Sequence, residues 1–181
     1  MVHEKLLMIR FNRGDRRVLC DIYALYKDEL VSLATALLHD KTPAEDAVHD
    51  VFAGLITRQQ TLKITKNLRS YLLTAVANAA RKQYHSKSRE PKISLDAENI
   101  PEIDTNDRPD LAVIDDEQKH QLAAALSALP YDQREVILLR HFSGMKFKVI
   151  ASIQNVSNNT VQGRYRYGIE KLRSLLNGEI L

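Results

Sequence analysis

The stretch 147–172, FKVIASIQNVSNNTVQGRYRYGIEKL, decides the fold of the C-terminal part of this chain, because it has the pattern of two short helices joined by a tight turn. Asn155 lies at the turn, where its side chain tolerates a left-handed backbone, and Ser157 is a good N-cap for the second helix. In that helix, apolar side chains recur at i, i+4, i+8 and i+11 and make one buried stripe. The stripe consists of Val161, Tyr165, Ile169 and Leu172.

The opposite face of the second helix carries polar or small residues that can reach the edges of DNA bases. They are Asn159, Gln162, Gly163 and Arg166. This layout predicts a helix-turn-helix whose second helix enters the major groove. A helical hairpin with a solvated polar face has the same pattern, since short helix-turn-helix patterns also arise by chance. The choice between the two depends on whether the rest of the chain has a reason to bind DNA.

Composition restricts the class of protein. With 181 residues, 44% of them hydrophobic and 27% charged, the chain is expected to form one large or two small soluble domains. The net charge of +3 is modest, so function depends on where the charges lie. The single Cys20 fits a reducing cytosol. The apolar patch at 6–9 is too short for a signal peptide or a membrane span, so we expect a cytoplasmic protein.

The N-terminal half has the apolar periodicity of helices. Residues 15–38 form a long amphipathic pattern, and a further helix pattern runs over 68–84. Between them, TPAE at 42–45 combines an N-cap Thr, a Pro at the first helical position and a Glu at N3, which is a capping box. Residues 57–67 are a polar loop without strong periodicity. These elements predict a helical N-terminal domain over residues 1–90.

The character of the chain changes at 91–117, where three prolines, many acidic residues and low hydrophobicity predict a flexible linker. Helical periodicity resumes after it, and residues 118–181 are expected to form a second domain that contains the helix-turn-helix. The predicted fold is therefore all-α, with two small helical domains joined by a flexible acidic linker.

A second nucleic-acid signal lies where a helix with a basic end follows a polar loop. Asn78 and Arg81 share a helix face, and the Lys- and Arg-rich stretch after them can neutralise phosphates. The loop 63–67 beside this helix can hold a base pulled out of the stack, since amide groups recognise Watson–Crick edges. A solvated basic face before a linker explains the same residues equally well.

An acidic cluster lies on the helix that begins near residue 42. Its members are Glu45, Asp46, His49 and Asp50. The pairs at 39–40 and 49–50 resemble the His-Asp pairs of metal-dependent phosphohydrolases, but neighbouring side chains point about 100° apart on a helix, and further ligands are not evident. A solvated acidic face or a docking surface for a basic partner is the favoured interpretation. With no Ser/His/Asp or Cys/His arrangement and no Gly-rich phosphate loop, we expect no catalytic residues, metal or cofactor.

Several stretches together resemble the extracytoplasmic-function sigma factors of bacterial RNA polymerase, which are small members of the sigma-70 family with only conserved regions 2 and 4. The most specific stretches are AED..HDVF at 44–52, YLLTAVANAAR at 71–81 and LP..QREVILLRHFSGM at 129–145, followed by the helix-turn-helix. The resemblance covers about 10–90 and about 118–177.

The resemblance implies three contact sets and no enzymatic activity. The face that would dock on the clamp helices of the largest polymerase subunit consists of Glu45, Asp46, His49 and Asp50. The residues that would recognise and open the −10 promoter element are Lys63, Lys66, Asn67, Asn78, Arg81 and Lys82. The residues that would contact the −35 duplex are Asn158, Asn159, Thr160, Gln162, Gly163, Arg164, Arg166 and Tyr167. Further implied partners are the flap of the second-largest subunit and an anti-sigma factor clasped between the domains.

The chain departs from the family pattern at positions that affect DNA recognition. The family usually has Gln at His49, Trp at Tyr71, and Lys or Arg followed by Ser at 162–163. The promoter sequence therefore stays open.

Two other functions also stay open. A stand-alone helix-turn-helix regulator would bind its operator without polymerase, although no dimerising heptad is visible. A metal phosphohydrolase would hold bound metal.

Overall fold

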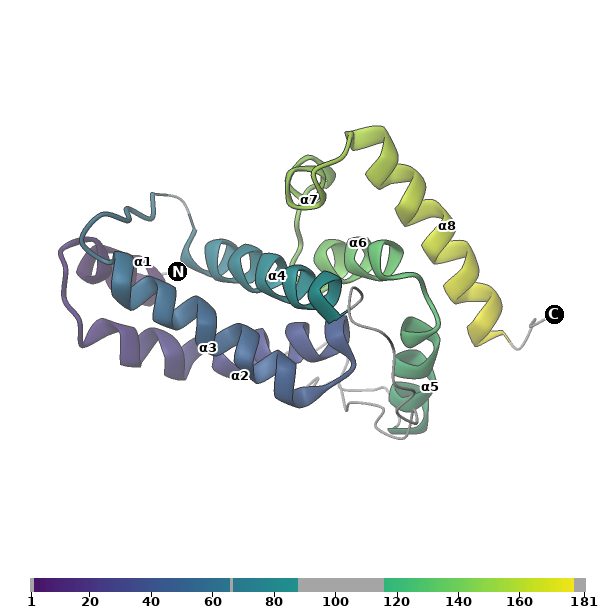
Figure 1. The fold of residues 1–181 in the computed structure, drawn as a ribbon, viewed down its shortest axis with the longest axis horizontal. Coiled ribbons are helices and arrows are strands. Elements are labelled where there is room, and N and C mark those ends of the chain that lie inside the picture. The colour runs from purple at the N-terminus through teal and green to yellow at the C-terminus, as the bar shows by residue number, and fades with distance from the viewer. Residues whose placement is uncertain (1, 66, 88–115, 178–181) are drawn as a thin grey trace.

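The computed structural model describes residues 2–65, 67–87 and 116–177, and the regular elements in these ranges are helices (Figure 1). They are α1 (Val2–Asn12), α2 (Val18–Leu38), α3 (Lys41–Arg58), α4 (Leu68–Lys87), α5 (Asp116–Ser127), α6 (Tyr131–His141), α7 (Phe147–Gln154) and α8 (Asn158–Leu176). The all-α prediction is confirmed. The predicted linker 91–117 lies outside the described residues except for its last two positions, which open α5.

Helix α2 is the centre of the N-terminal group. It packs against α3 and α4, which also pack on each other, and α1 lies against α2 and α4. The apolar stripe expected along α2 is buried in full. It consists of Val18, Leu19, Ile22, Tyr26, Leu30, Leu33 and Leu37. Helices α3 and α4 cover this stripe with small and branched side chains such as Ala44, Val48, Leu72 and Val76.

The start of α3 differs from the predicted capping box. Helix α2 ends at His39, whose φ of 58° is left-handed, and Asp40 follows in an extended conformation as the N-cap of α3. The Asp40 carboxylate accepts a hydrogen bond from the Thr42 backbone N–H at 3.1 Å. Asp is at least as good an N-cap as Thr, and it stands closer to the end of α2, so the helix begins two residues before the predicted position.

The helix-turn-helix in the C-terminal group is confirmed. Asn155 ends α7 with a φ of 52°, and the Ser157 hydroxyl accepts a hydrogen bond from the Thr160 backbone N–H at 3.1 Å. Val161 is fully buried. The rest of the predicted stripe on α8 packs against the core, half-buried, through Tyr165, Ile169 and Leu172. Helix α6 supports both α7 and α8, and α5 lies along α8.

The two groups of helices pack against each other. Helix α2 contacts α5 and α6, and α4 contacts α7. Figure 1 shows α6 beside the C-terminal end of α4, with α7 above the place where they meet and α8 beyond α6. The buried apolar side chains of both groups consequently form one continuous cluster. Among the described residues, no helix combines the length and apolar character needed to cross a membrane.

The closest approach of α8 to α6 depends on Gly168. A Cβ added at this glycine would lie 2.9 Å from Ile137 Cδ1 and 3.2 Å from Gln133 Cβ.

Alanine at position 168 would gain up to about 1 kcal/mol of helix propensity, but overpacking of a buried contact typically costs about 1–3 kcal/mol. We therefore expect Gly168→Ala to lower the free energy of unfolding by roughly 1 kcal/mol in chemical denaturation. An increase in that free energy would show that α6 and α8 are not tightly packed here.

Candidate nucleic-acid and protein interfaces

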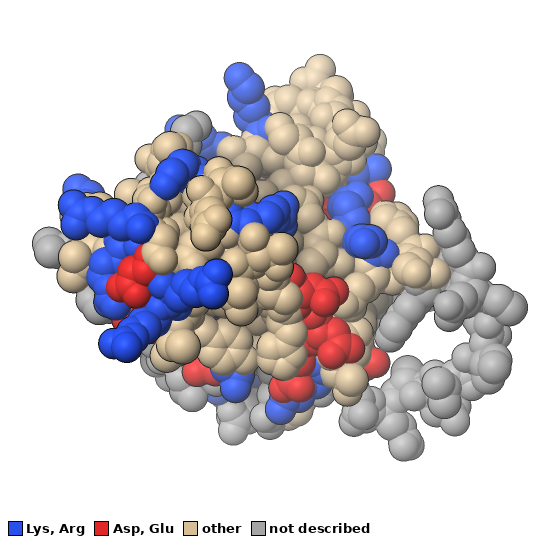
Figure 2. All heavy atoms as spheres, turned by 60° about the vertical axis from the view of Figure 1, so that its left-hand side comes forward, with Lys and Arg blue, Asp and Glu red and all other residues tan. Residues whose placement is uncertain are grey.

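The acidic face of α3 is presented to solvent. Asp46, His49 and Asp50 are exposed, and Glu45 is half-buried. The His49 ring stacks on Tyr23 from α2, with His49 Nε2 3.3 Å from the Tyr23 hydroxyl, and Tyr23 in turn packs edge-on against Phe52. In Figure 2 most of the acidic side chains in view lie low near the centre of the face, with basic side chains to the left and right of them and some acidic atoms among the basic ones. Within the described part of the chain, no group of three or more His, Cys, Asp and Glu side chains is arranged to hold a metal ion.

The loop before α4 is anchored to α1, which the sequence did not indicate. The Asn12 side chain donates to the Ile64 carbonyl at 2.8 Å and accepts from the Ile64 N–H at 3.0 Å. The exposed Lys63 ammonium contacts the Asn12 carbonyl. Gln59 is buried and donates to the Asp15 carbonyl at 2.9 Å. These contacts give a polar loop a defined shape.

The predicted −10 residues divide between two surfaces. Asn67 acts as a cap of α4, since its side-chain oxygen accepts from the Ser70 N–H at 2.7 Å. Lys66 lies outside the described residues. Asn78 and Lys82, both exposed and one helical turn apart, line an open groove of about 520 Å³ between α3 and α4, to which Tyr71 and Arg58 also contribute. Asp50, a member of the acidic face, lines the same groove as Asn78 and Lys82.

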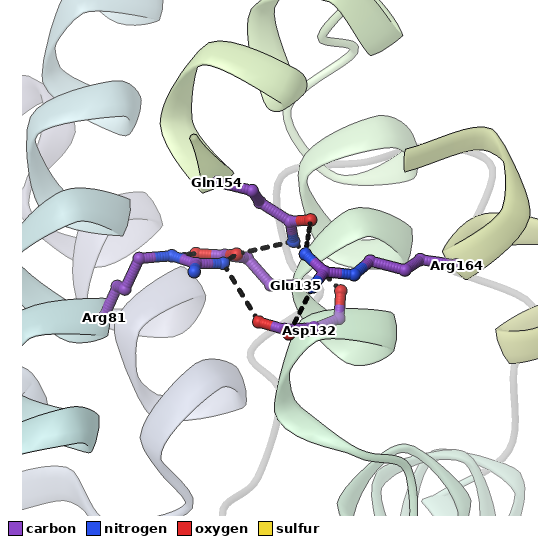
Figure 3. A network of polar contacts seen from close by, with 5 residues as sticks. All are labelled: Arg81, Asp132, Glu135, Gln154 and Arg164. Atoms are coloured by element: carbon purple, nitrogen blue, oxygen red, sulfur yellow. Dashed lines mark hydrogen bonds and ion pairs between the residues drawn. The ribbon is translucent and has the colours of Figure 1, made fainter. Parts of the chain in front are cut away.

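Arg81 points away from this groove and into α6. Its Nε donates to Glu135 Oε1 at 3.1 Å, its Nη2 contacts Glu135 Oε2, and the same Nη2 lies 3.4 Å from Asp132 Oδ1 (Figure 3). The Glu135 carboxylate is fully shielded from solvent, and Arg81 keeps only 16% of its side chain exposed. The structure thus separates Arg81 from Asn78, although both belong to one predicted set.

Arg164 reaches Asp132 from the opposite side (Figure 3). Its Nη2 lies 2.8 Å from Asp132 Oδ2, and its Nη1 donates to Gln154 Oε1 at 2.6 Å. Gln154 then donates through Nε2 to Glu135 Oε2 at 2.7 Å. We call these five residues, which are Arg81, Asp132, Glu135, Gln154 and Arg164, the interdomain network. It joins α4 to α6, α7 and α8.

A second bridge runs through Arg134, which is 3% exposed. Its Nη2 donates to the Leu37 carbonyl at 2.8 Å and so caps the C-terminal end of α2, where the helix dipole favours a cation. Tyr131 lies under the Arg134 guanidinium and stacks on Tyr84 of α4 with ring centroids 4.1 Å apart. Burial lowers the pKa of Arg134 and raises that of Tyr131.

The polar face of α8 is assembled as expected. Asn158, Asn159, Thr160, Gln162, Arg166 and Tyr167 are exposed, and Gly163 is half-buried. Four of the predicted residues line an open notch of about 360 Å³. They are Asn159, Gln162, Gly163 and Arg166. Arg164 is not on this face. Arg166 donates to the Tyr167 hydroxyl at 3.3 Å and lies over its ring, so these two side chains hold each other at the edge of the notch.

Sequence reasoning missed Asp132, Arg134, Glu135 and Gln154. A signal existed, because Arg134 and Glu135 stand directly before the apolar residues 136–139 of α6. Charged residues are almost never fully buried unless they are paired. The sequence offered no way to identify the partners, which lie 54 residues away in the case of Arg81 and Glu135.

Comparisons with known proteins agree in both halves of the chain. The model for Sigma-70 region 2 matches residues 22–90, and the model for Sigma-70, region 4 matches residues 119–172, which together exceed half of the chain. RNA polymerase sigma factor CarQ of Myxococcus xanthus is 26% identical over 174 residues, covering 96% of this chain and 97% of that protein. ECF RNA polymerase sigma factor SigW of Bacillus subtilis is 24% identical over 185 residues, covering 97% of each.

Two solved structures share the fold. Sigma factor RpoE in complex with the anti-sigma factor NepR, from Bartonella quintana, has a TM-score of 0.64 at 23% identity, covering 87% of this chain and 95% of that chain. CnrH in complex with the cytosolic domain of CnrY has a TM-score of 0.66 at 20% identity, covering 98% and 99%.

The turn residue His39 has a lowered pKa, so we expect the free energy of unfolding to depend on pH. Burial, and to a lesser extent the charge of Arg134, lowers the pKa of His39 to about 4. A base whose pKa falls on folding binds fewer protons in the folded state than in the unfolded state. The free energy of unfolding is therefore highest above about pH 6.5, and it falls as the pH decreases from 6.5 towards 4.

His39→Asn removes this titration and keeps a residue that tolerates the left-handed backbone. Between pH 7 and pH 5, we expect the free energy of unfolding of the wild type to fall by roughly 1 kcal/mol more than that of the variant, allowing for solvent screening of a partly exposed group. Denaturant titrations at both pH values measure this. Parallel pH profiles would contradict the burial of His39 against Arg134.

Proposed function

The chain belongs to the extracytoplasmic-function group of the sigma-70 family and directs promoter-specific initiation by RNA polymerase, and we propose that its two halves divide this work. The N-terminal helices bind core polymerase and the −10 element, and the C-terminal helices bind the −35 element. The polymerase supplies the chemistry, so no catalytic step is assigned to this chain. The proposal places the protein in the cytoplasm, where bacterial RNA polymerase acts.

The observation that carries this proposal is the exposed polar face of α8 within a helix-turn-helix. A recognition helix of this kind enters the major groove, where Gln pairs with adenine and Arg with guanine or phosphate. Gln162 and Arg166 project beside Gly163 from that face, and the turn at Asn155 and the cap at Ser157 fix how α8 is presented. We assign this helix to duplex DNA at the −35 element.

The groove between α3 and α4 suits a single strand. Tyr71 offers a ring on which a base can stack, Asn78 an amide for a Watson–Crick edge, and Lys82 a cation for the backbone. Because the groove would bind unpaired bases, its binding free energy would favour the melted promoter over the duplex. We therefore assign this groove to the opened −10 element and the adjoining acidic face of α3 to the clamp helices of the polymerase. The flap of the second-largest subunit is the proposed contact of the C-terminal helices.

The two DNA contacts require the interdomain network to open. Arg81 and Arg164 both contact the Asp132 carboxylate. The −10 and −35 elements lie about 25 base pairs apart, which is roughly 85 Å at about 3.4 Å per base pair. One chain cannot hold both elements with these arginines on one carboxylate. Separation of the halves frees Arg81 from Asp132 and Glu135. Arg164 keeps Asp132 and Gln154 as partners within the C-terminal half, and the α8 notch and the α3–α4 groove are open already.

The solved relatives suggest a protein partner for this chain. RpoE and CnrH were each solved with a second protein, an anti-sigma factor for RpoE and the cytosolic domain of CnrY for CnrH. We extend this to the present chain and propose an anti-sigma factor that covers the exposed faces of the two halves. Such a partner would compete with core polymerase.

Charge reversal on α3 tests the polymerase contact. Asp46 is exposed, so Asp46→Arg leaves the fold intact while placing a cation where the proposed interface needs an anion. We expect affinity for core polymerase to fall at least about tenfold, which corresponds to about 1.4 kcal/mol. Asp28→Arg makes the same charge change at an exposed position of α2 and serves as the control. Equal affinities for wild type and Asp46→Arg would remove the docking face from the proposal.

Removal of the groove amide tests the −10 assignment. Asn78→Ala should leave closed-complex binding nearly unchanged and reduce permanganate reactivity of thymines in the transcription bubble several-fold, because the amide contacts only an unpaired base. Asn177→Ala, the same truncation at the end of α8, is the matched control. Unchanged bubble reactivity with Asn78→Ala would show that the groove does not hold the strand.

A further inference from the structure

Helix α8 contains two glycines, and only one of them is explained by packing within the chain. Glycine in a helix interior lowers helix stability, so its presence calls for a compensating reason. At Gly168 the reason is close contact, since an added Cβ would lie 2.9 Å from Ile137 Cδ1. At Gly163 an added Cβ would meet no described atom within 4 Å apart from its chain neighbours and the backbone of its own helix. Its φ is also not in the left-handed region, so the backbone does not require glycine there.

Gly163 lies at the floor of the notch on the polar face of α8. Asn159 stands one turn before it, Arg166 about one turn after it, and Gln162 beside it, so three side chains with hydrogen-bonding groups surround a position that has none. The floor of the notch is the helix backbone itself. A group that enters the notch therefore meets an apolar Cα surface, while its neighbours meet amides and a guanidinium.

We propose that Gly163 determines promoter specificity by admitting the C5-methyl group of a thymine in the −35 element. This inference rests on the proposed function of α8. The thymine methyl is the one apolar group that the bases present in the major groove, and apolar protein groups contact it. Asn159 and Gln162 are then placed to pair with adenine, and Arg166 with guanine or phosphate, at adjoining positions.

A side chain at Gly163 tests this assignment. Wild-type holoenzyme, formed with core polymerase, first selects duplexes from a library randomised over the −35 region. The selected duplex is then compared with copies in which deoxyuridine, which lacks the methyl group, replaces one thymine at a time. We expect the wild type to bind one of these copies about three- to tenfold more weakly.

Gly163→Ala should raise the melting temperature of the protein and bind the thymine duplex about tenfold more weakly than the wild type, with no discrimination between thymine and deoxyuridine. Gly54→Ala, the same change in α3, controls for the effect of helix stabilisation on the melting temperature alone, because its added Cβ meets the flexible end of Arg58, which lines the α3–α4 groove. Wild-type binding that is insensitive to every deoxyuridine, or a Gly163→Ala holoenzyme that discriminates as the wild type does, would overturn the inference. Failure of the proposed function has a different signature, in which wild-type holoenzyme selects no −35 sequence, and this would overturn both.

Discussion

The ion pair between Arg81 and Glu135 governs how the two halves of this protein are arranged. The Glu135 carboxylate has no solvent exposure and receives hydrogen bonds from Arg81 and Gln154. A carboxylate taken out of water costs several kcal/mol unless a cation and hydrogen-bond donors compensate it. The cation comes from α4 and the carboxylate from α6, so the compensation exists only while the halves are in contact. Arg134 adds a second tie by capping α2.

The same features make the contact reversible. A buried ion pair is weak as a net source of stability, because the desolvation of both charges nearly offsets their attraction. When the halves separate, Arg81 leaves Glu135 and Asp132, and water can hydrate these three groups. A phosphate can then take the place of the carboxylates as the partner of Arg81, while Arg164 keeps its contacts within the C-terminal half. The interdomain network thus holds the two halves together in this structure, and we propose that polymerase and promoter replace it.

Within each half, local sequence patterns predicted the helices and their buried faces. The periodicity of α2 and α8, the turn at Asn155 and the cap at Ser157 are local signals, and the structure confirms them. Competition between neighbouring caps decided the start of α3, where Asp40 acts in place of Thr42. For the candidate site, the notch around Gly163 follows from spacing along one helix. The sequence placed Asn78 on one face with Arg81, whereas in the structure Asn78 lines the groove with Lys82. The direction of Arg81 does not follow from spacing, because periodicity shows which face is covered but not which distant element covers it.

The distance between the halves tests the central claim most directly. Cys20 on α2 is exposed, and Lys171→Cys adds an exposed partner on α8, so spin labels at these positions report the separation of the two groups by pulsed electron resonance. A closed protein held by the interdomain network should give one narrow distribution when free and a clearly longer distance after core polymerase and promoter DNA are added. A broad distribution in the free protein, or a distance that polymerase and DNA leave unchanged, would contradict the account.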